Sequence, residues 1–193
     1  MTKTINRRTF VKSLSLSIGS LLLLTTCKYD LRTKWRFFTK EEQSLVDAIV
    51  DQIIPADKWM GAKEAGVTNY IDKQLVGPLS RFQESYKKGL AAIKLTCEEI
   101  HQIDFCYLER DKQIEFLVNM EKGNFTMLRS LKKQTEEGMI WGNQSTKEFF
   151  NLIRDHAMQG YYGSPRHGGN YKYVSYKMIA LDFLPVQGQN RYQ

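Results

Sequence analysis

The sequence is short of the residues from which metal sites and redox centres are built. Its 193 residues include three cysteines and three histidines. No Cys-x-x-Cys pair and no Cys-x-x-Cys-His segment occurs, which excludes the common redox dithiol and the usual covalent haem attachment. His101, His156 and His167 lie in three separate segments, whereas the ligands of a zinc site must lie close together. The sequence therefore predicts no metal and no cofactor bound by this chain itself.

Cysteine is also too scarce to hold the fold together. Cys27 follows an N-terminal apolar stretch, which leaves only Cys97 and Cys106 for the rest of the chain. These two could form a disulfide if the helix that carries Cys97 ends before Cys106, or both could be buried thiols, and we favour buried thiols. The domain must then be stabilised by an apolar core.

Alternating apolar and polar residues, the pattern of a half-buried strand, are missing too. Thr39 and Glu42 have the pattern of a capping box, Ser80 and Ser145 open two further ones, and Asp111 is the expected cap of another helix. The sequence therefore predicts an all-α fold, one domain of about six helices. Apolar residues at helical spacing place these helices at residues 40–54, 67–76, 82–100, 111–122, 125–138 and 146–160.

Catalytic side chains do not group by spacing either. Adjacent acids such as Glu41 and Glu42 point about 100° apart on a helix, which suits a cap or a solvated face better than a catalytic pair. His156 falls on the apolar face of its predicted helix, where we expect a hydrogen-bonded core histidine. His167 lies in a loop, but one loop histidine does not specify a reaction. We therefore expect no autonomous enzyme.

Residues 1–26 have the features of a twin-arginine export signal. Arg7 and Arg8 are followed by Phe10 and by a short apolar stretch, which is not long enough for a comfortable membrane span. The segment ending at Cys27 resembles a lipoprotein cleavage box, so Cys27 is the candidate lipidated residue, with Thr26 departing from the usual small residue before it. We expect a chain exported to the periplasmic face and anchored in the membrane through its lipid.

The basic net charge belongs largely to this signal. The chain carries a formal net charge of +7, from 28 basic and 21 acidic residues. Four of the basic residues and none of the acids lie in residues 1–26, so the remainder has 24 basic residues against 21 acids, a net charge of +3. Because no basic stripe remains, nucleic acid is not an expected partner. Residues 27–38 are the expected tether, and residues 39–193 the helical domain.

Residues 160–170 are predicted to form an ordered loop, rich in glycine and tyrosine, near the C-terminus. The segment holds four glycines, one proline and one asparagine. Its glycine spacing does not fit a dinucleotide fingerprint, which also needs a preceding strand. The candidate interface and loop-shaping residues are Tyr161, Tyr162, Gly163, Arg166, His167, Gly168, Gly169 and Asn170.

The most specific segments of the sequence are Ile53-Ile54-Pro55-Ala56-Asp57 and the loop from Gly160-Tyr161-Tyr162-Gly163 to Gly168-Gly169-Asn170, beside the Gly61–Val67 stretch. Together these segments resemble the gluconate 2-dehydrogenase subunit 3 family. The likeness covers nearly all of the chain after the twin-arginine leader. The resemblance implies a small, cofactor-free subunit of a periplasmic, membrane-associated sugar or sugar-acid dehydrogenase. Such a subunit is found beside a large FAD-bearing flavoprotein and often a multihaem cytochrome c subunit.

Two functions are therefore expected from the sequence. The first is a non-catalytic accessory subunit that binds, stabilises and co-exports an FAD-dependent dehydrogenase of the glucose-methanol-choline type. The twin-arginine pathway carries folded proteins, so a small chain without a visible cofactor site gains from it by escorting a flavin-loaded partner. The alternative is a free-standing periplasmic lipoprotein that binds carbohydrate through its aromatic loop.

Overall fold

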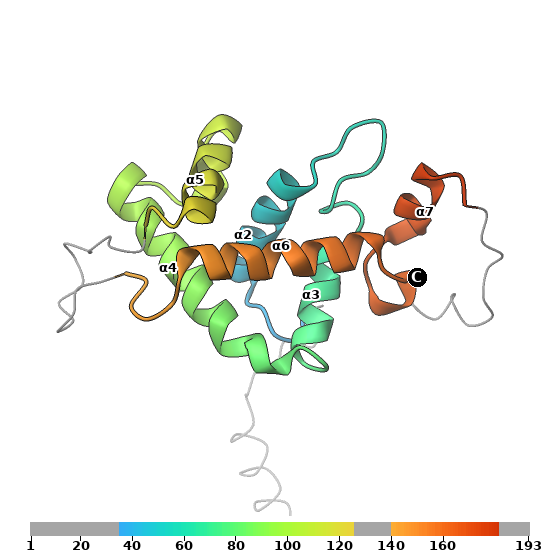
Figure 1. The fold of residues 1–193 in the computed structure, drawn as a ribbon, viewed down its shortest axis with the longest axis horizontal. Helices are drawn as coiled ribbons and strands as arrows, with labels where there is room; N and C mark the ends of the chain where they lie inside the picture. Colours follow the sequence, from blue (N-terminus) through green and yellow to red (C-terminus); the bar gives the residue numbers. More distant parts are fainter. Residues whose placement is uncertain (1–34, 126–139, 182–193) are drawn as a thin grey trace, which may run out of the picture. The chain divides into compact units, whose positions relative to one another are not determined.

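The computed structural model describes residues 35–125 and 140–181, which belong to one compact unit. In these residues the chain is all-α, as predicted, with six α-helices, four short 3-10 turns and no strand (Figure 1). The export signal, Cys27 and the helix predicted over residues 125–138 lie wholly or almost wholly outside the described residues. The helices are α2 (Lys40–Ile53), α3 (Val67–Leu75), α4 (Gln83–His101), α5 (Arg110–Lys122), α6 (Thr146–Tyr162) and α7 (Val174–Met178).

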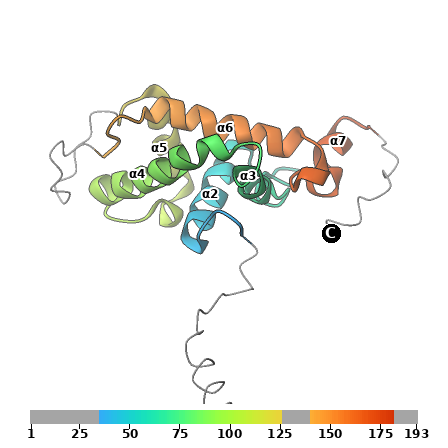
Figure 2. The ribbon, with the colours of Figure 1, turned by 90° about the horizontal axis from the view of Figure 1, so that it is seen from below.

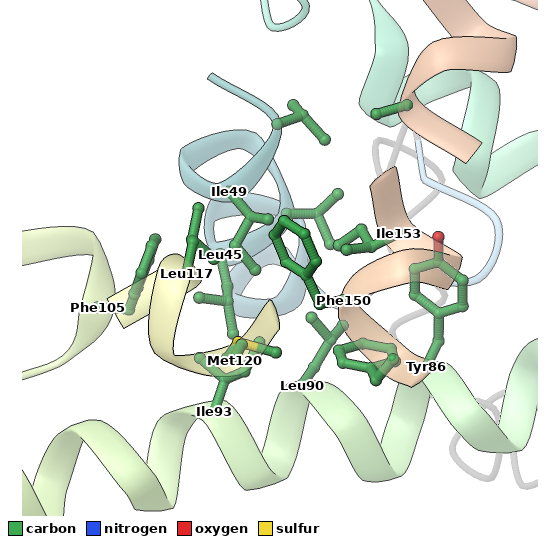
Figure 3. Packing of buried hydrophobic residues seen from close by; sticks show 14 of the residues in the cluster. Leu45, Ile49, Tyr86, Leu90, Ile93, Phe105, Leu117, Met120, Phe150 and Ile153 are labelled. Atoms are coloured by element: carbon green, nitrogen blue, oxygen red, sulfur yellow. The ribbon is translucent and has the colours of Figure 1, made fainter. Parts of the chain in front are cut away.

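Helix α6 is the element that the other helices share. It contacts α2, α3, α4, α5 and α7, and two views show it running across the rest of the bundle (Figures 1 and 2). Figure 3 shows Ile49 of α2 together with Leu117 and Met120 of α5, and Phe150 and Ile153 of α6 beside them. All five side chains are buried. Each such side chain contributes about 1.5–3 kcal/mol through burial, so the core follows from the apolar faces of the predicted helices.

The predicted helix starts are only partly confirmed. Thr39 and Glu42 form a reciprocal capping box, in which the Thr39 N–H donates to Glu42 Oε2 at 2.8 Å. The Ser145 hydroxyl accepts from the Glu148 N–H at 3.3 Å and caps α6. The capping box predicted at Ser80 is wrong, because Ser80 opens a 3-10 turn through Phe82 and α4 begins at Gln83 without a side-chain cap.

The register of α5 differs from the prediction. The helix begins at Arg110, so Asp111 lies in its first turn, where a carboxylate favours the helix N-terminus, and is not its cap. Apolar spacing alone would turn Ile114 toward the core with Leu117, but Ile114 is 41% exposed and Gln113 is buried. The amide of Gln113 donates to the Phe105 carbonyl at 2.9 Å, which satisfies this buried group on the face that also holds Leu117 and Met120.

A buried carboxylate holds the residues that precede α2. Asp72, fully buried on α3, accepts the backbone N–H groups of Arg36, Phe37 and Phe38 at 2.8, 2.9 and 3.0 Å. The buried ring of Phe38 lies beside Tyr86, with the ring centroids 5.8 Å apart. Three irregular backbone donors are thereby satisfied by one side chain. These hydrogen bonds therefore hold residues 36–38 against α3.

Replacing Asp72 with asparagine tests this carboxylate. The amide group of Asp72→Asn puts a donor where one acceptor oxygen was, so at least one buried N–H loses its partner. We expect the free energy of unfolding, measured with urea, to fall by about 2–3 kcal/mol. The control is Asp155→Asn, which removes an exposed contact with Arg154 and is expected to change stability by no more than about 0.5 kcal/mol. Equal stability of the two variants would contradict the role of Asp72.

Candidate functional site

The predicted loop lies on α3 and on the turn that precedes it. The side-chain amide of Asn69 donates to the Gly168 carbonyl at 2.7 Å. The Tyr171 N–H donates to the Ala65 carbonyl at 3.0 Å. The ring of Tyr70 lies directly against Gly160. The structure thus joins the two segments that carry the sequence resemblance, the turn around residues 53–67 and the loop at residues 160–170, although they are far apart in the chain.

Two glycines allow this joint to close. A side chain on Gly169 would overlap the backbone carbonyl of Gly160, so the loop returns against α6 at a distance that only glycine permits. Gly168 has a φ of 103°, in the left-handed region, and a Cβ there would lie 2.7 Å from the Asn69 amide nitrogen. The glycine-rich composition therefore reflects close backbone packing.

Asn170, the last residue of the loop, forms hydrogen bonds with residues on both sides of it in the chain. Asn170 is fully buried in a left-handed conformation, with φ 47° and ψ 44°. Its amide nitrogen donates to the Gly163 carbonyl at 2.8 Å, and its amide oxygen accepts the Ser175 N–H at 3.0 Å. The Tyr176 hydroxyl donates to the same Gly163 carbonyl at 3.3 Å. Asn170 thus couples the end of α6 to the start of α7.

Tyr161 and Tyr162 have different environments. Tyr161 is buried, its hydroxyl donates to the Met60 carbonyl at 2.7 Å, and burial raises its pKa, which keeps the donor proton in place. The ring of Tyr162 packs edge-on against that of Tyr161, with the centroids 5.0 Å apart, and is 48% exposed. Tyr161 therefore shapes the loop, while Tyr162 is available to a partner.

The expected helix end at Gly160 is wrong. Helix α6 continues through Tyr162 and ends at Gly163, whose N–H donates to the Gln159 carbonyl at 2.9 Å. Gly160 therefore lies inside the helix, where the absence of a side chain leaves room for Tyr70 and Gly169. Gly160 is needed for a packing contact, and the sequence alone does not distinguish such a glycine from one that ends a helix.

Arg166 and His167 lie on the outer part of the loop. Both are exposed in the 3-10 turn Pro165–His167, which Gly168 ends. The structure therefore divides the eight predicted residues. Gly169, Asn170 and Tyr161 are buried, Gly163 and Gly168 are partly buried, and Tyr162, Arg166 and His167 face outward.

His156 is a core histidine, as expected. Its Nδ1 lies 3.0 Å from the Tyr86 hydroxyl, and the ring of Phe82 packs edge-on at 5.2 Å between centroids. Burial lowers the pKa of His156 to about 4 and raises the pKa of Tyr86 well above its usual value. The neutral imidazole and the protonated phenol therefore share one hydrogen bond, so this pair is a satisfied contact between α4 and α6.

The two cysteines in the described residues are free thiols. Cys97 is buried, and burial raises its pKa to about 12; burial also raises the pKa of Cys106 to about 11. Such thiols hold their protons and are poor nucleophiles. Over residues 35–125 and 140–181, no three His, Cys, Asp or Glu side chains lie together as a metal site would require.

Sequence reasoning missed Asp72. The residue belongs to the buried face of α3, since it follows Thr68 by one helical turn and precedes Leu75 by three residues. An acid on such a face is a signal that a buried acceptor is needed, although its backbone partners cannot be named without the structure. A buried hydrogen bond from Trp141 Nε1 to Thr96 Oγ1, at 3.1 Å, was missed for the same reason.

The fold and the loop define an all-α protein with a hydrogen-bonded surface built where two glycine-containing segments meet. Residues 40–182 match the family model of gluconate 2-dehydrogenase subunit 3. The chain belongs to this family, and membership implies association with a larger dehydrogenase complex. No curated protein and no solved structure matches the chain. In the part of the chain that the structure describes, none of the helices is long and apolar enough to span a membrane.

The low pKa of His156 predicts a pH-dependent stability. The pKa of His156 is about 4 in the folded protein and about 6.5 in the unfolded chain. As the pH falls, the unfolded chain therefore binds a proton at His156 before the folded protein does, which favours unfolding. This contribution is complete above about pH 6.5 and is lost toward pH 4. We expect a loss of about 2 kcal/mol between about pH 7.5 and pH 5 in urea unfolding. His156→Gln should remove this loss and the exposed His167→Gln should keep it; an unchanged pH profile in His156→Gln would contradict the assignment.

The close contact at Gly169 predicts a large effect of one added methyl group. In Gly169→Ala the new Cβ collides with backbone, so either α6 or the loop must move, and we expect the free energy of unfolding to fall by about 2–3 kcal/mol. Gly77→Ala is the matched control, because the nearest atom to its added Cβ lies 3.7 Å away. Thermal unfolding followed by circular dichroism measures both, and a Gly169→Ala protein as stable as Gly77→Ala would refute the contact.

Proposed function

We propose that this chain is the cofactor-free accessory subunit that binds and stabilises a large FAD-dependent dehydrogenase of the glucose-methanol-choline type. The substrate would be a sugar or sugar acid, and the flavin would be held by the large subunit. A multihaem cytochrome c subunit would be the third member of the complex. The family match over residues 40–182 carries this proposal, because it implies a place in a larger dehydrogenase complex.

The geometry of the loop supports a binding role. Its buried residues are used up in internal contacts, as the bonds of Asn170 and Tyr161 show. This fixed backbone carries three outward residues, Tyr162, Arg166 and His167. One histidine with a tyrosine and an arginine does not specify a reaction. Arginine and tyrosine are the residue types that protein interfaces favour. The loop thus has the composition of a contact surface.

Export is the second part of the proposal. The twin-arginine segment at Arg7 and Arg8 would carry the folded pair across the membrane, and a lipid on Cys27 would hold the complex at the periplasmic face. The rival function, a free-standing lipoprotein that binds carbohydrate, receives less support. The ring and the hydroxyl of Tyr161 are both occupied inside the protein, which removes one of the aromatic residues available for stacking on a sugar.

Co-expression with a candidate FAD-dependent dehydrogenase of the glucose-methanol-choline type from the same organism tests the proposal. The tagged chain should co-purify with that subunit and its FAD from the periplasmic membrane fraction. In the Arg7→Lys/Arg8→Lys variant both proteins should remain in the cytoplasm, because the pathway requires the arginine pair. A chain that purifies alone and free of flavin would refute the complex. A flavoprotein that is exported without this chain would refute the escort role.

A further inference from the structure

The exposed large apolar side chains of the described residues form two groups, with Val76 apart from both. We call them the α4–α5 surface and the α6–α7 surface. The α4–α5 surface consists of Ile100, Ile103, Tyr107, Ile114 and Val118. The α6–α7 surface consists of Met158, Tyr162, Tyr171, Met178, Ile179 and Leu181. Groups of exposed apolar side chains mark interaction sites, so each surface is a candidate contact.

The α4–α5 surface is acidic. Residues 98–122 carry seven acids against three bases, a net charge of −4. One of the bases, Lys112, is already paired with Glu115 at 2.9 Å. The pKa of Glu115 is lowered by Lys112 and also by His101, so the end of α4 lies near the exposed side of α5. The exposed apolar side chains of α4 and α5 therefore share one negatively charged region.

The α6–α7 surface is basic. Residues 154–181 carry four bases against one acid, a net charge of +3. The acid, Asp155, is exposed on α6 and lies 3.4 Å from the guanidinium of Arg154, which offsets its charge. The neighbouring turn Pro55–Gly66 has two lysines and two acids and adds no net charge. The bases that remain are Arg166, Lys172 and Lys177.

Contacts within the α6–α7 surface hold its parts together. The ring of Tyr161 packs against that of Tyr162, and the Tyr161 hydroxyl lies 3.5 Å from the sulfur of Met178. The Lys172 ammonium lies 5.3 Å from the centre of the Tyr171 ring, so a positive charge directly adjoins an exposed apolar side chain. This surface thus combines apolar area with positive charge, as the α4–α5 surface combines apolar area with negative charge.

The two surfaces lie at opposite ends of α6. Figures 1 and 2 both show α5 and the end of α4 near the start of α6, and α7 beyond the end of α6. Helices α5 and α7 each contact α6, which fixes the surfaces relative to each other. One chain can therefore use both surfaces at the same time, each toward a different neighbour.

We propose that the α4–α5 surface of one chain binds the α6–α7 surface of a second copy in a head-to-tail contact. The charges on both sides of this contact belong to this chain, and a region of −4 meets a region of +3. The apolar side chains of the two surfaces then cover each other. The contact does not involve the flavoprotein, so the inference goes beyond the proposed function.

The same charges disfavour a symmetric dimer. In a two-fold contact each surface meets its own copy, which would bring two acidic regions or two basic regions together. A head-to-tail contact joins unlike surfaces and leaves one of each free at the two ends of the pair. Further copies can therefore add in a row, and the assembly grows with protein concentration.

Sedimentation velocity of the chain without the flavoprotein tests the contact. The protein is the full chain with Cys27→Ser, which cannot be lipidated. We expect a sedimentation coefficient that rises with protein concentration at about 50 mM salt and rises much less at about 500 mM, because salt screens the attraction between the surfaces. A chain that stays monomeric up to about 200 μM at low salt would overturn the inference.

Matched substitutions locate the contact. Tyr107→Ser/Ile114→Ser changes the α4–α5 surface, and Tyr162→Ser/Ile179→Ser changes the α6–α7 surface. All four residues are exposed, so both proteins should fold, which a thermal unfolding curve checks. Each variant alone should associate at least roughly tenfold more weakly than the parent. The control is Val76→Ser, an exposed apolar residue outside both surfaces, which should associate like the parent.

Mixing the two variants distinguishes a head-to-tail contact from a symmetric one. Each variant keeps one intact surface, so the mixture should form a pair with one copy of each variant, and this pair cannot grow. A mixture that forms no pair would contradict the inference. Loss of association in only one of the two variants would indicate a symmetric contact and overturn it, and loss in neither would overturn the choice of surfaces.

Charge reversal tests the complementarity by itself. Arg166→Glu/Lys177→Glu places acids opposite the acidic α4–α5 surface, so association at low salt should be lost. Association that is unaltered in this variant would refute the pairing of charges. None of these measurements includes the flavoprotein, so a negative result leaves the proposed function standing.

Discussion

The approach of the Gly169 backbone to the Gly160 carbonyl is the constraint on which the C-terminal third of the domain depends. It brings the loop back against α6, and from there Gly168 reaches Asn69 on α3 while Asn170 reaches Gly163 and Ser175. Helix α7 and the tyrosines around it take their positions from this return. A few missing side-chain atoms thus determine where a whole surface lies.

The helices could be predicted from the sequence because each leaves a periodic apolar face, and α2, α4 and α6 lie close to their expected ranges. The positions of single residues were predicted wrongly where a polar or close packing contact was present. In α5, Ile114 faces outward while the adjacent Gln113 is buried and bonded to the Phe105 carbonyl. In α6, Gly160 lies inside the helix against Tyr70 and Gly169, not at the helix end. Periodicity reports the balance of burial along a helix, and it does not contain the partners of single polar groups.

For the site, the sequence identified the right segment without separating its residues. Composition alone marks residues 160–170 as special, but Tyr161 and Tyr162 are identical in type and opposite in exposure. Only the position of Met60, whose carbonyl receives the Tyr161 hydroxyl, distinguishes them. The same holds for Asp72, whose role depends on Phe38 from another segment, and for the partner of His156, because the sequence predicted a core histidine without identifying Tyr86. Such roles are tertiary, so one sequence without its structure cannot assign them.

The hydrogen bonds from Asp72 to residues 36–38 also limit how far the helical domain can lie from Cys27. With a lipid on Cys27, about nine residues would separate the anchor from the first bonded residue, Arg36, and a chain of that length spans at most roughly 30 Å. The helical domain would then work within one small-protein diameter of the bilayer, and a partner bound to it would be kept at that height.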